Sequence, residues 1–392
     1  MNVSNQLSRS REALINSSRH SCEGRNPATF KALDPGLRQG DGINQSFPSS
    51  PIKKVVIWAP RKLGNALMTL PAIQLLRANC PDAEVSVVCH PILQSLFRSQ
   101  SWVSEVIEDS SKSKGLMTGN LSLLRELRRR RFNLGIVFHK AVRCALLFRL
   151  AGVMQVIGFA GSGHRFLLDY SQRSDDGTHR VNRHAMLVNE YFGRPARFLP
   201  APHLDHAPLP TPLFVNSKLT LGLHLGTPSK GCRSYPTAQA CALISRLVSR
   251  RNVNIVLLGD QAEQKESPEY ARAAAGYDDF LDLRGKTDLP SLVSTVATLD
   301  LLVAIDSSVM HIAAAVGTEF IVLLGRSHVP FELVRPKVPF GIYLDRGDML
   351  IQECEKITSI SVDDVLNAID DVLAKAKKKN SSRYEDQSLG KL

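Results

Sequence analysis

The segment 304–315, AIDSSVMHIAAA, places a carboxylate, hydroxyl groups and an imidazole at the junction of two predicted elements. An apolar run ends just before Asp306, and small residues typical of a closely packed helix follow. Asp306 and Ser307 stand where a helix N-cap is expected, and free backbone N–H groups beyond them could hold a pyrophosphate. His311 lies one turn into this helix, on the side expected to face the strand ends. The alternative is structural: Asp306 only caps the helix, and His311 is a hydrogen-bonded interior residue.

A second polar segment, GLHLGTPSKGCRSYP at 222–236, passes from an apolar strand pattern into a loop with hydroxyl and cationic side chains. Thr227, Lys230 and Arg233 could donate hydrogen bonds to phosphate oxygens and balance the charge of a departing diphosphate. A site of this kind needs no metal ion. The alternative is an ordinary basic surface loop, because such loops are common on basic proteins.

Short apolar strands that alternate with helices must position these side chains. In parallel sheets covered by helices, ligands bind beyond the carboxyl ends of the strands, which is where both polar segments fall. The sequence therefore predicts an α/β fold with two doubly wound, Rossmann-like domains that face a cleft. The predicted strands are 54–58, 84–89, 131–138, 155–159, 219–224, 253–259, 301–305 and 320–325, and the predicted helices include 65–79, 141–151 and 362–377.

The predicted domains are an N-terminal one at 51–205 and a C-terminal one at 213–377. A stretch rich in Pro, His and Arg, about 175–212, is predicted to hold the linker between them. Residues 1–50 have no sustained apolar period, and we expect them to be disordered. A disordered polar tail is expected at 378–392.

The formal net charge of +12 on 392 residues favours anionic partners but does not choose among nucleic acid, membrane and phosphorylated substrate. No uninterrupted apolar stretch is long enough to span a membrane, and the N-terminus lacks the apolar core of a signal peptide, so we expect a cytoplasmic protein. The seven cysteines are scattered without metal-ligand spacing, which favours reduced thiols and no metal site.

Taken in order, five segments resemble the ADP-heptose:lipopolysaccharide heptosyltransferases, which are members of glycosyltransferase family 9. The resemblance covers about residues 53–335, and the motifs are specific only in combination. The segments are VVIWAPRKLGNALMTLPAIQLLRANCPDAEVSVV, GLHLGTPSKGCRSYP, VLLGDQAEQ, LDLRGKTDL and AIDSSVMHIAAAVGTEFIVLLG.

This resemblance implies a GT-B fold and inverting transfer of heptose from ADP-heptose to the lipopolysaccharide inner core, with no metal and no cofactor. It also places Glu263 at the nucleotide ribose, Thr287 at the adenine and Gly64 in the tight loop beneath the donor. Ser308 occupies a position where the family usually has Gly, so a side chain could hinder close approach of the diphosphate.

The positive charge is expected to serve an anionic core acceptor and a peripheral contact with the inner face of the inner membrane. The candidate acceptor residues are Arg61, Lys62, Arg143 and Arg165, and Lys377, Lys378 and Lys379 are candidates for a contact with the membrane.

Asn65 is the main departure from the family pattern, because the family usually has Gly-Asp where this chain has Gly64-Asn65. The family's Asp is the expected general base, and a carboxamide cannot take a proton near pH 7. His139, which follows a predicted strand of the same domain, could replace that base; the alternative is a structural histidine.

Three other classes of protein are alternatives to the enzyme. A nicotinamide-dependent dehydrogenase would need G-x-G-x-x-G after its first strand, where this chain has APRKLG. A nucleic-acid-binding protein would account for the charge, but no helix-turn-helix, zinc-finger or aromatic-basic pattern is present, so no nucleic-acid partner is expected. A catalytically silent heptosyltransferase-like binding protein stays open because of Asn65 and Ser308.

Overall fold

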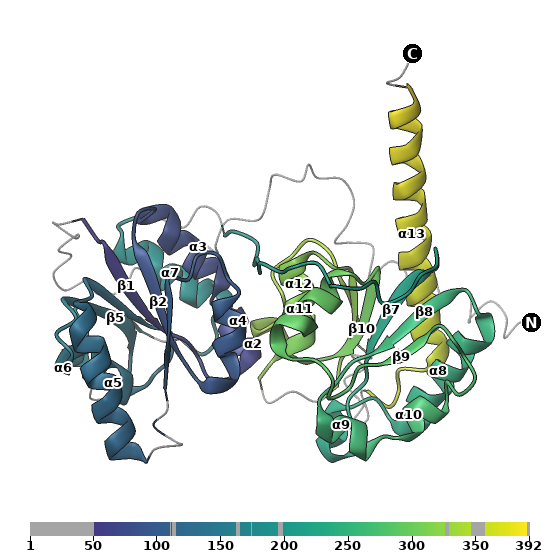
Figure 1. The fold of residues 1–392 in the computed structure, drawn as a ribbon, viewed down its shortest axis with the longest axis horizontal. Coiled ribbons are helices and arrows are strands. Elements are labelled where there is room, and N and C mark those ends of the chain that lie inside the picture. The colour runs from purple at the N-terminus through teal and green to yellow at the C-terminus, as the bar shows by residue number, and fades with distance from the viewer. Residues whose placement is uncertain are drawn as a thin grey trace, which may run out of the picture.

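The computed structural model describes residues 51–109, 111, 115–161, 165–173, 175–194, 199–325, 329–345 and 357–389. They form two lobes, each built on a parallel sheet of six strands (Figure 1), as the alternating pattern predicted. The disorder predicted for residues 1–50 lies outside the described residues, as does the end of the predicted polar tail at 390–392.

The N-terminal sheet has the order β3-β2-β1-β4-β5-β6, so the chain turns back between β1 and β4. Its strands are β1 (Lys54–Trp58), β2 (Glu84–Cys89), β3 (Glu105–Glu108), β4 (Leu134–Val137), β5 (Gln155–Ala160) and β6 (Tyr170–Arg173). Successive residues of β1 are buried on opposite faces of the sheet: Val56 packs in one apolar cluster with α5 and α6, and Val55 in another with α3 and α7. The helices are α2 (Leu63–Leu67), α3 (Leu70–Asn79), α4 (Gln94–Arg98), α5 (Leu116–Arg130), α6 (Val142–Leu150) and α7 (Arg180–Tyr191), with the 3-10 turns η1 (Pro91–Leu93) and η2 (Arg165–Leu167).

The C-terminal sheet repeats this arrangement in the order β12-β11-β10-β7-β8-β9, so its chain turns back between β7 and β10. The strands are β7 (Leu219–His224), β8 (Val253–Leu257), β9 (Phe280–Asp282), β10 (Leu301–Ile305), β11 (Phe320–Leu323) and β12 (Ile342–Leu344). One face packs against α8 and α13, and the other against α11 and α12. The helices are α8 (Thr237–Arg250), α9 (Gln261–Glu266), α10 (Glu269–Arg272), α11 (Leu289–Ala297), α12 (Ser308–Val316) and α13 (Val362–Leu389), with the 3-10 turns η3 (Pro228–Arg233) and η4 (Phe331–Leu333).

The lobes touch through α2 and α12 and through the segment that connects them. The buried Leu204 donates its backbone N–H to Ala315 O of α12 at 3.1 Å. Its neighbour Asp205 accepts hydrogen bonds from the backbone N and the hydroxyl of Ser101, both at 2.7 Å. The connecting segment is therefore fastened to both lobes. None of the helices in the described part of the chain combines the length and apolar character needed to cross a bilayer.

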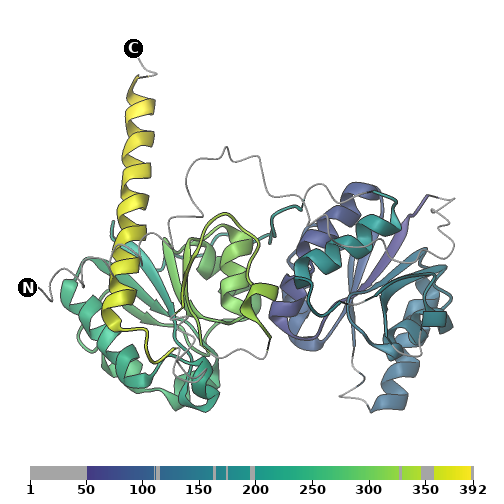
Figure 2. The same cartoon turned by 180° about the vertical axis from the view of Figure 1, so that it is seen from behind.

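Four expectations differ from the structure. The helix predicted at 65–79 is two helices, because Pro71 has no N–H to continue the first one. The predicted linker began too early, since α7 at 180–191 packs on α3 of the N-terminal lobe. The last helix continues past 377, since neither Gly nor Pro occurs between that residue and Gly390 to end it (Figure 2). Cys232 is disulfide-bonded rather than a reduced thiol.

Candidate functional site

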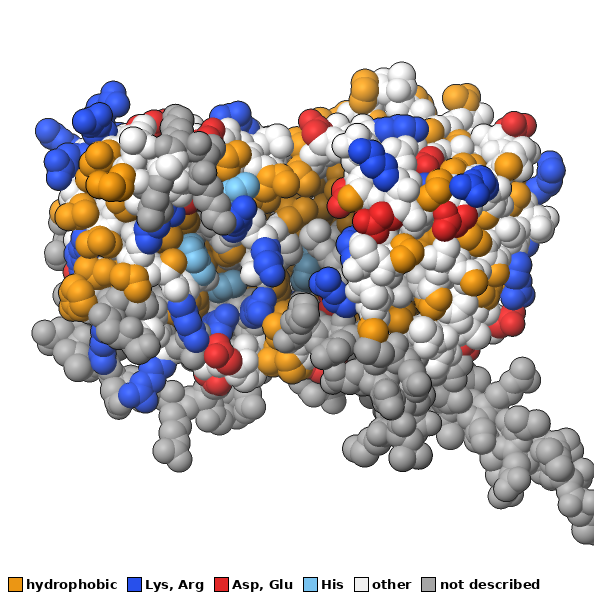
Figure 3. All heavy atoms as spheres, turned by 90° about the horizontal axis from the view of Figure 1, so that it is seen from below, with side chains coloured by type: hydrophobic (Ala, Val, Ile, Leu, Met, Phe, Trp, Pro, Cys, Tyr) orange, Lys and Arg blue, Asp and Glu red, His pale blue; other side chains and the backbone are white. Residues whose placement is uncertain are grey.

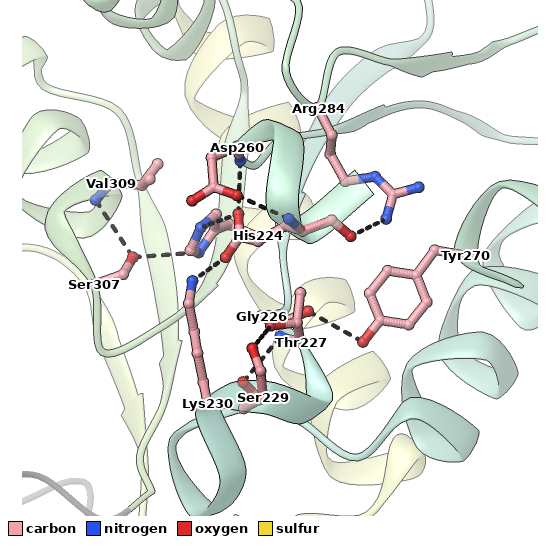
Figure 4. Close-up of polar contacts among 12 residues, drawn as sticks. His224, Gly226, Thr227, Ser229, Lys230, Asp260, Tyr270, Arg284, Ser307 and Val309 are labelled. Atoms are coloured by element: carbon pink, nitrogen blue, oxygen red, sulfur yellow. Dashed lines mark hydrogen bonds and ion pairs between the residues drawn. The ribbon is translucent and has the colours of Figure 1, made fainter. Parts of the chain in front are cut away.

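The polar side chains of the C-terminal lobe meet where β7 and β10 diverge, the point at which doubly wound sheets bind ligands. His224 is the last residue of β7, and Ser307 follows the end of β10. The Ser307 hydroxyl lies 3.3 Å from Nδ1 of His224, so the two strand ends are bridged by side chains (Figure 4). The prediction had not included His224; its only signal in the sequence is its place at the carboxyl end of a buried strand.

The N-terminus of α12 opens at this point. Ser307 is its N-cap, with extended backbone, and its hydroxyl accepts a hydrogen bond from Val309 N at 3.3 Å. The sequence was consistent with either Asp306 or Ser307 as the N-cap, and in the structure the N-cap is Ser307. Ser308 is the first residue of the helix and is partly exposed. A helix start beside two strand ends suits an anion such as a phosphate.

Glu263 is the centre of the polar network. It is 4% exposed, and its carboxylate accepts a hydrogen bond from Asp260 N at 2.8 Å while Asp260 in turn accepts from Glu263 N, which is a capping box. The other carboxylate oxygen binds Nζ of Lys230, and Nε2 of His224 lies 3.5 Å from the first. Lys230 and Glu263, which were expected at the phosphates and the ribose, therefore contact each other directly.

The electrostatics of this cluster favour an ionised Glu263. Burial alone would raise the pKa of the carboxyl group, but hydrogen bonds and charge from His224 and Lys230 outweigh it and hold the pKa well below its usual range. This carboxylate holds the ammonium group of Lys230, and 34% of the lysine side chain stays exposed. The pair thus fixes a cation at the mouth of the site.

Replacing Glu263 with glutamine should destabilise the folded protein by about 2–3 kcal/mol at pH 7, because Lys230 loses its buried counter-charge. The folded pKa is depressed, so this contribution is present above the unfolded pKa of about 4.3 and is lost as pH falls below it. Urea unfolding of wild type and variant at pH 7 and at lower pH should show the difference shrinking on acidification. Glu319→Gln, on the exposed surface, is the matched control. A difference in unfolding free energy that does not change with pH would contradict an ionised Glu263 paired with Lys230.

The remaining donor-side candidates surround this cluster. Thr227 is buried and donates its backbone N–H to the Ser234 hydroxyl at 2.9 Å, whereas Arg233 is exposed at the end of η3. Thr287 is half-buried and precedes Asp288, the N-cap of α11. Arg284, which the prediction missed, is 2% exposed and binds Asp282 together with the backbone oxygens of Glu263 and Ser267.

The N-terminal lobe faces the start of α12 through Gly64 and Asn65 on α2. A side-chain carbon built at Gly64 would lie 3.5 Å from Cδ2 of His311 and 3.8 Å from Cβ of Ser308. The Oδ1 atom of Asn65 accepts a hydrogen bond from Nη1 of Arg180 at 2.9 Å. Because arginine only donates hydrogen bonds, the oxygen of the Asn65 amide must face Arg180. The NH₂ group of Asn65 is therefore directed away from Arg180 and can donate to another group.

Buried histidines and cations meet across the two lobes here. Burial lowers the pKa of His311 to about 4, so its imidazole is neutral at pH 7. Burial, and then the charge of Lys337, lowers the pKa of His179 to about 3. Nδ1 of His179 accepts from Val181 N, so Nε2 donates to Arg335 O at 3.0 Å in the other lobe. Cationic side chains (Lys or Arg) and His side chains line the hollow between the lobes in Figure 3. His179 and Arg180 were not predicted as site residues, because their segment has the composition of a linker.

His139 lies in a different environment from Asn65. Its Nε2 is 3.5 Å from Sγ of Cys144, and its buried Nδ1 has no hydrogen-bond partner among the described residues. Burial lowers its pKa to about 4; the charge of Asp109 opposes this, and Arg143 adds to it. His139 is therefore neutral at pH 7, and its described contacts are separate from the Asn65–Arg180 hydrogen bond.

The four cations predicted to bind the acceptor are not equivalent. Arg143 is held by both carboxylate oxygens of Asp109 at 2.9 and 2.7 Å and lies over the ring of Trp58, so its charge is already balanced. Arg61, Lys62 and Arg165 are exposed, the first two immediately before α2 and the third at the start of η2. Within the described ranges, no group of His, Cys, Asp or Glu side chains is arranged to hold a metal ion.

Two doubly wound lobes that face each other across polar strand ends define the GT-B class of glycosyltransferase folds. The model of the family "Glycosyltransferase family 9 (heptosyltransferase)" matches residues 120–332, and the chain belongs to this family. The resemblance inferred from the sequence motifs is thereby confirmed, and the chain is a glycosyltransferase.

Named relatives and solved structures agree with this assignment. Lipopolysaccharide heptosyltransferase 2 of Salmonella typhimurium is 23% identical over 71% of this chain and 84% of the relative. The structure of Escherichia coli ADP-heptose LPS heptosyltransferase II has a TM-score of 0.71 at 19% identity, over 83% of this chain and 99% of that one. A family 9 glycosyltransferase from Veillonella parvula has a TM-score of 0.73 at 18% identity, over 82% and 98% of the two chains.

Proposed function

We propose that this protein transfers heptose from ADP-heptose to an anionic inner-core acceptor of lipopolysaccharide, with inversion and without a metal ion. One observation carries the proposal: the Lys230–Glu263 pair and the His224–Ser307 bridge stand at the switch point of the C-terminal sheet, opposite Gly64 of the other lobe. A solved relative, E. coli heptosyltransferase WaaC, carries the ADP-heptose analogue ADP-2-deoxy-2-fluoro heptose at a TM-score of 0.64 and 16% identity over 81% of this chain and 99% of that one.

The transfer itself is a single displacement. The acceptor hydroxyl oxygen attacks the anomeric carbon, the bond from that carbon to the diphosphate oxygen breaks, and ADP leaves with the electron pair. Lys230, Arg233 and the N-terminal N–H groups of α12 would offset the charge that grows on the diphosphate. His311, neutral at pH 7, would contribute a hydrogen bond rather than a charge.

The hydroxyl proton must go to a base, and Asn65 does not offer one. Its Oδ1 already accepts from Arg180. The Asn65 NH₂ would hold the acceptor oxygen, and the proton would pass to another group or to water at reduced rate. The anionic parts of the acceptor would meet Arg180 and Lys337 at the junction of the lobes, since Arg180 contacts Asn65 and the charge of Lys337 acts on His179. We place this activity at the cytoplasmic face of the inner membrane, where a lipid-linked acceptor would be reached.

The donor site is tested by titrating ADP against Asp306→Ala, His311→Gln and wild type. Loss of a polar contact to a diphosphate should weaken binding about tenfold in each variant. Because His311 is buried, thermal melts must first show that its variant is folded. Unchanged ADP affinity in both would remove these residues from the site and leave the donor proposal without its α12 contacts.

A second candidate function is favoured by Asn65: a heptosyltransferase-like protein that binds donor or acceptor and does not transfer. The two functions separate in one experiment, a turnover assay with ADP-heptose and a deacylated core acceptor alongside ADP titration. ADP binding without release of ADP from ADP-heptose would favour the silent protein, and turnover would exclude it.

A further inference from the structure

Large apolar side chains are exposed on one surface of the N-terminal lobe. Of the nine large hydrophobic residues that are exposed in the described structure, seven belong to α5, α6, the turn after α6, and η2, so their exposure is concentrated rather than scattered. We call these seven the α5–α6 apolar patch: Met117, Leu121, Val142, Leu146, Leu150, Met154 and Phe166.

Helix geometry makes this patch continuous. Val142, Leu146 and Leu150 recur every four residues of α6, and therefore form one outward stripe. The helices are joined at their ends, since Nη2 of Arg128 on α5 donates to Leu150 O at 2.8 Å. On the other side, Nε of Arg149 donates to Leu167 O at 2.8 Å and fixes η2, which carries Phe166 with 80% of its surface exposed.

Arginines continue the same surface. Met117, Leu121, Arg125 and Arg128 share the outward face of α5, so that face is apolar in its first turns and cationic in its last. Arg125, Arg128, Arg129 and Arg131 line a shallow hollow. None of these four forms an ion pair within the described ranges, whereas the neighbouring Arg130 is paired with Glu105. The rim of the patch thus carries uncompensated positive charge.

We propose that the α5–α6 apolar patch and its arginine rim dock the protein on an anionic phospholipid bilayer. Single protruding side chains on convex helices suit insertion among lipid headgroups, while arginines beside them suit lipid phosphates. This inference goes beyond the proposed transfer reaction and uses no residue of the donor site.

The placement of the patch fits such docking. In Figure 3, apolar side chains gather on the outer part of the N-terminal lobe, and Lys and Arg side chains continue from there to the hollow between the lobes. A bilayer that contacts this face would therefore lie beside the mouth of that hollow. This surface was not among the membrane contacts expected from the sequence, although Arg165, an expected acceptor residue, lies next to Phe166 of the patch.

Vesicle co-sedimentation tests the proposal on the full chain, with phosphatidylcholine vesicles that contain or lack phosphatidylglycerol, at low and high salt. Wild type should sediment with the anionic vesicles, and less so at high salt. The double variant Arg125→Glu/Arg129→Glu should bind the anionic vesicles less, by at least about fivefold for each arginine replaced. Leu146→Glu with Leu150→Glu should reduce it about tenfold or more.

Matched controls are Ile92→Glu, an apolar residue of the same lobe that is 65% exposed, and Arg272→Glu on the exposed surface of the other lobe; both should sediment like wild type. ADP affinity should be unchanged in every variant, which separates this outcome from failure of the donor site. The proposal is overturned if patch variants and wild type partition equally. It is also overturned if wild type ignores the vesicles and the patch variants instead change its oligomeric state, since the patch would then be a contact between copies of this chain.

Discussion

Replacing Lys230 with methionine should lower kcat/KM for heptose transfer by about 10²- to 10³-fold, the usual effect of removing one donor aimed at developing charge. Glu263 occupies one of the three N–H donors of this ammonium and fixes its position, while 34% of the side chain stays exposed towards the site. The charge on a departing diphosphate grows during the reaction, so the loss should appear mainly in kcat. Steady-state kinetics with ADP-heptose, together with ADP titration, measure the two contributions.

Lys265→Met on the exposed side of α9 is the matched control and should leave both constants unchanged. The single Lys230→Met change strands a buried carboxylate, so stability must be followed too. Adding Glu263→Gln removes that unpaired charge and should recover stability without recovering turnover. Recovery of both would mean that Lys230 acts only through folding, and its proposed part in catalysis would be wrong.

The sequence was most informative where strands are largely buried. β2, β7 and β10 have the predicted boundaries to the residue, because short segments rich in apolar residues are typical of strands in a covered parallel sheet. The short outer strands β3, β6, β9 and β12 were missed. Their side chains are mostly half-buried, so EVIE or YSQR has no apolar period to recognise.

The site was predictable only in part, for a similar reason. Residues that follow a strand were found because the carboxyl edge of a parallel sheet is a general binding place. Their partners are set by how the elements pack: Lys230 meets Glu263 across 33 residues, and Ser307 meets His224 across 83. Arg180 was missed because its helix lies among Pro- and His-rich segments. Its apolar face of Val181, Ala185, Val188 and Tyr191 was the available signal.

The second large effect is expected at Asn65, where Asn65→Asp should raise turnover by about 10²- to 10⁴-fold, the range a positioned general base provides. α2 has only five residues, so its N-terminus contributes little to keeping a carboxylate ionised. Arg180 does so instead, because its Nη1 atom already lies 2.9 Å from the side-chain oxygen. Asn65→Ala, which loses the Arg180 contact without gaining a base, is the control and should not exceed wild type.

The competing account, in which His139 is the base, predicts a different pH profile. A base acts in its neutral form, so wild-type activity should be full above the pKa of His139 and fall as pH drops through about 4. Under this account His139→Gln should abolish turnover, and Asn65→Asp should change little. If Asn65 limits the rate instead, His139→Gln should have almost no effect on turnover, while Asn65→Asp gains activity that is lost at low pH as the new carboxylate is protonated.

The contacts of the two residues favour a rate limited by Asn65. His139 has a low pKa and lies against Cys144. Asn65, in contrast, adjoins Gly64, which faces His311 and Ser308 at the start of α12. Profiles of kcat for wild type and both variants distinguish the accounts. Absence of turnover in all three, with ADP still bound, would exclude both bases and favour the silent binding protein.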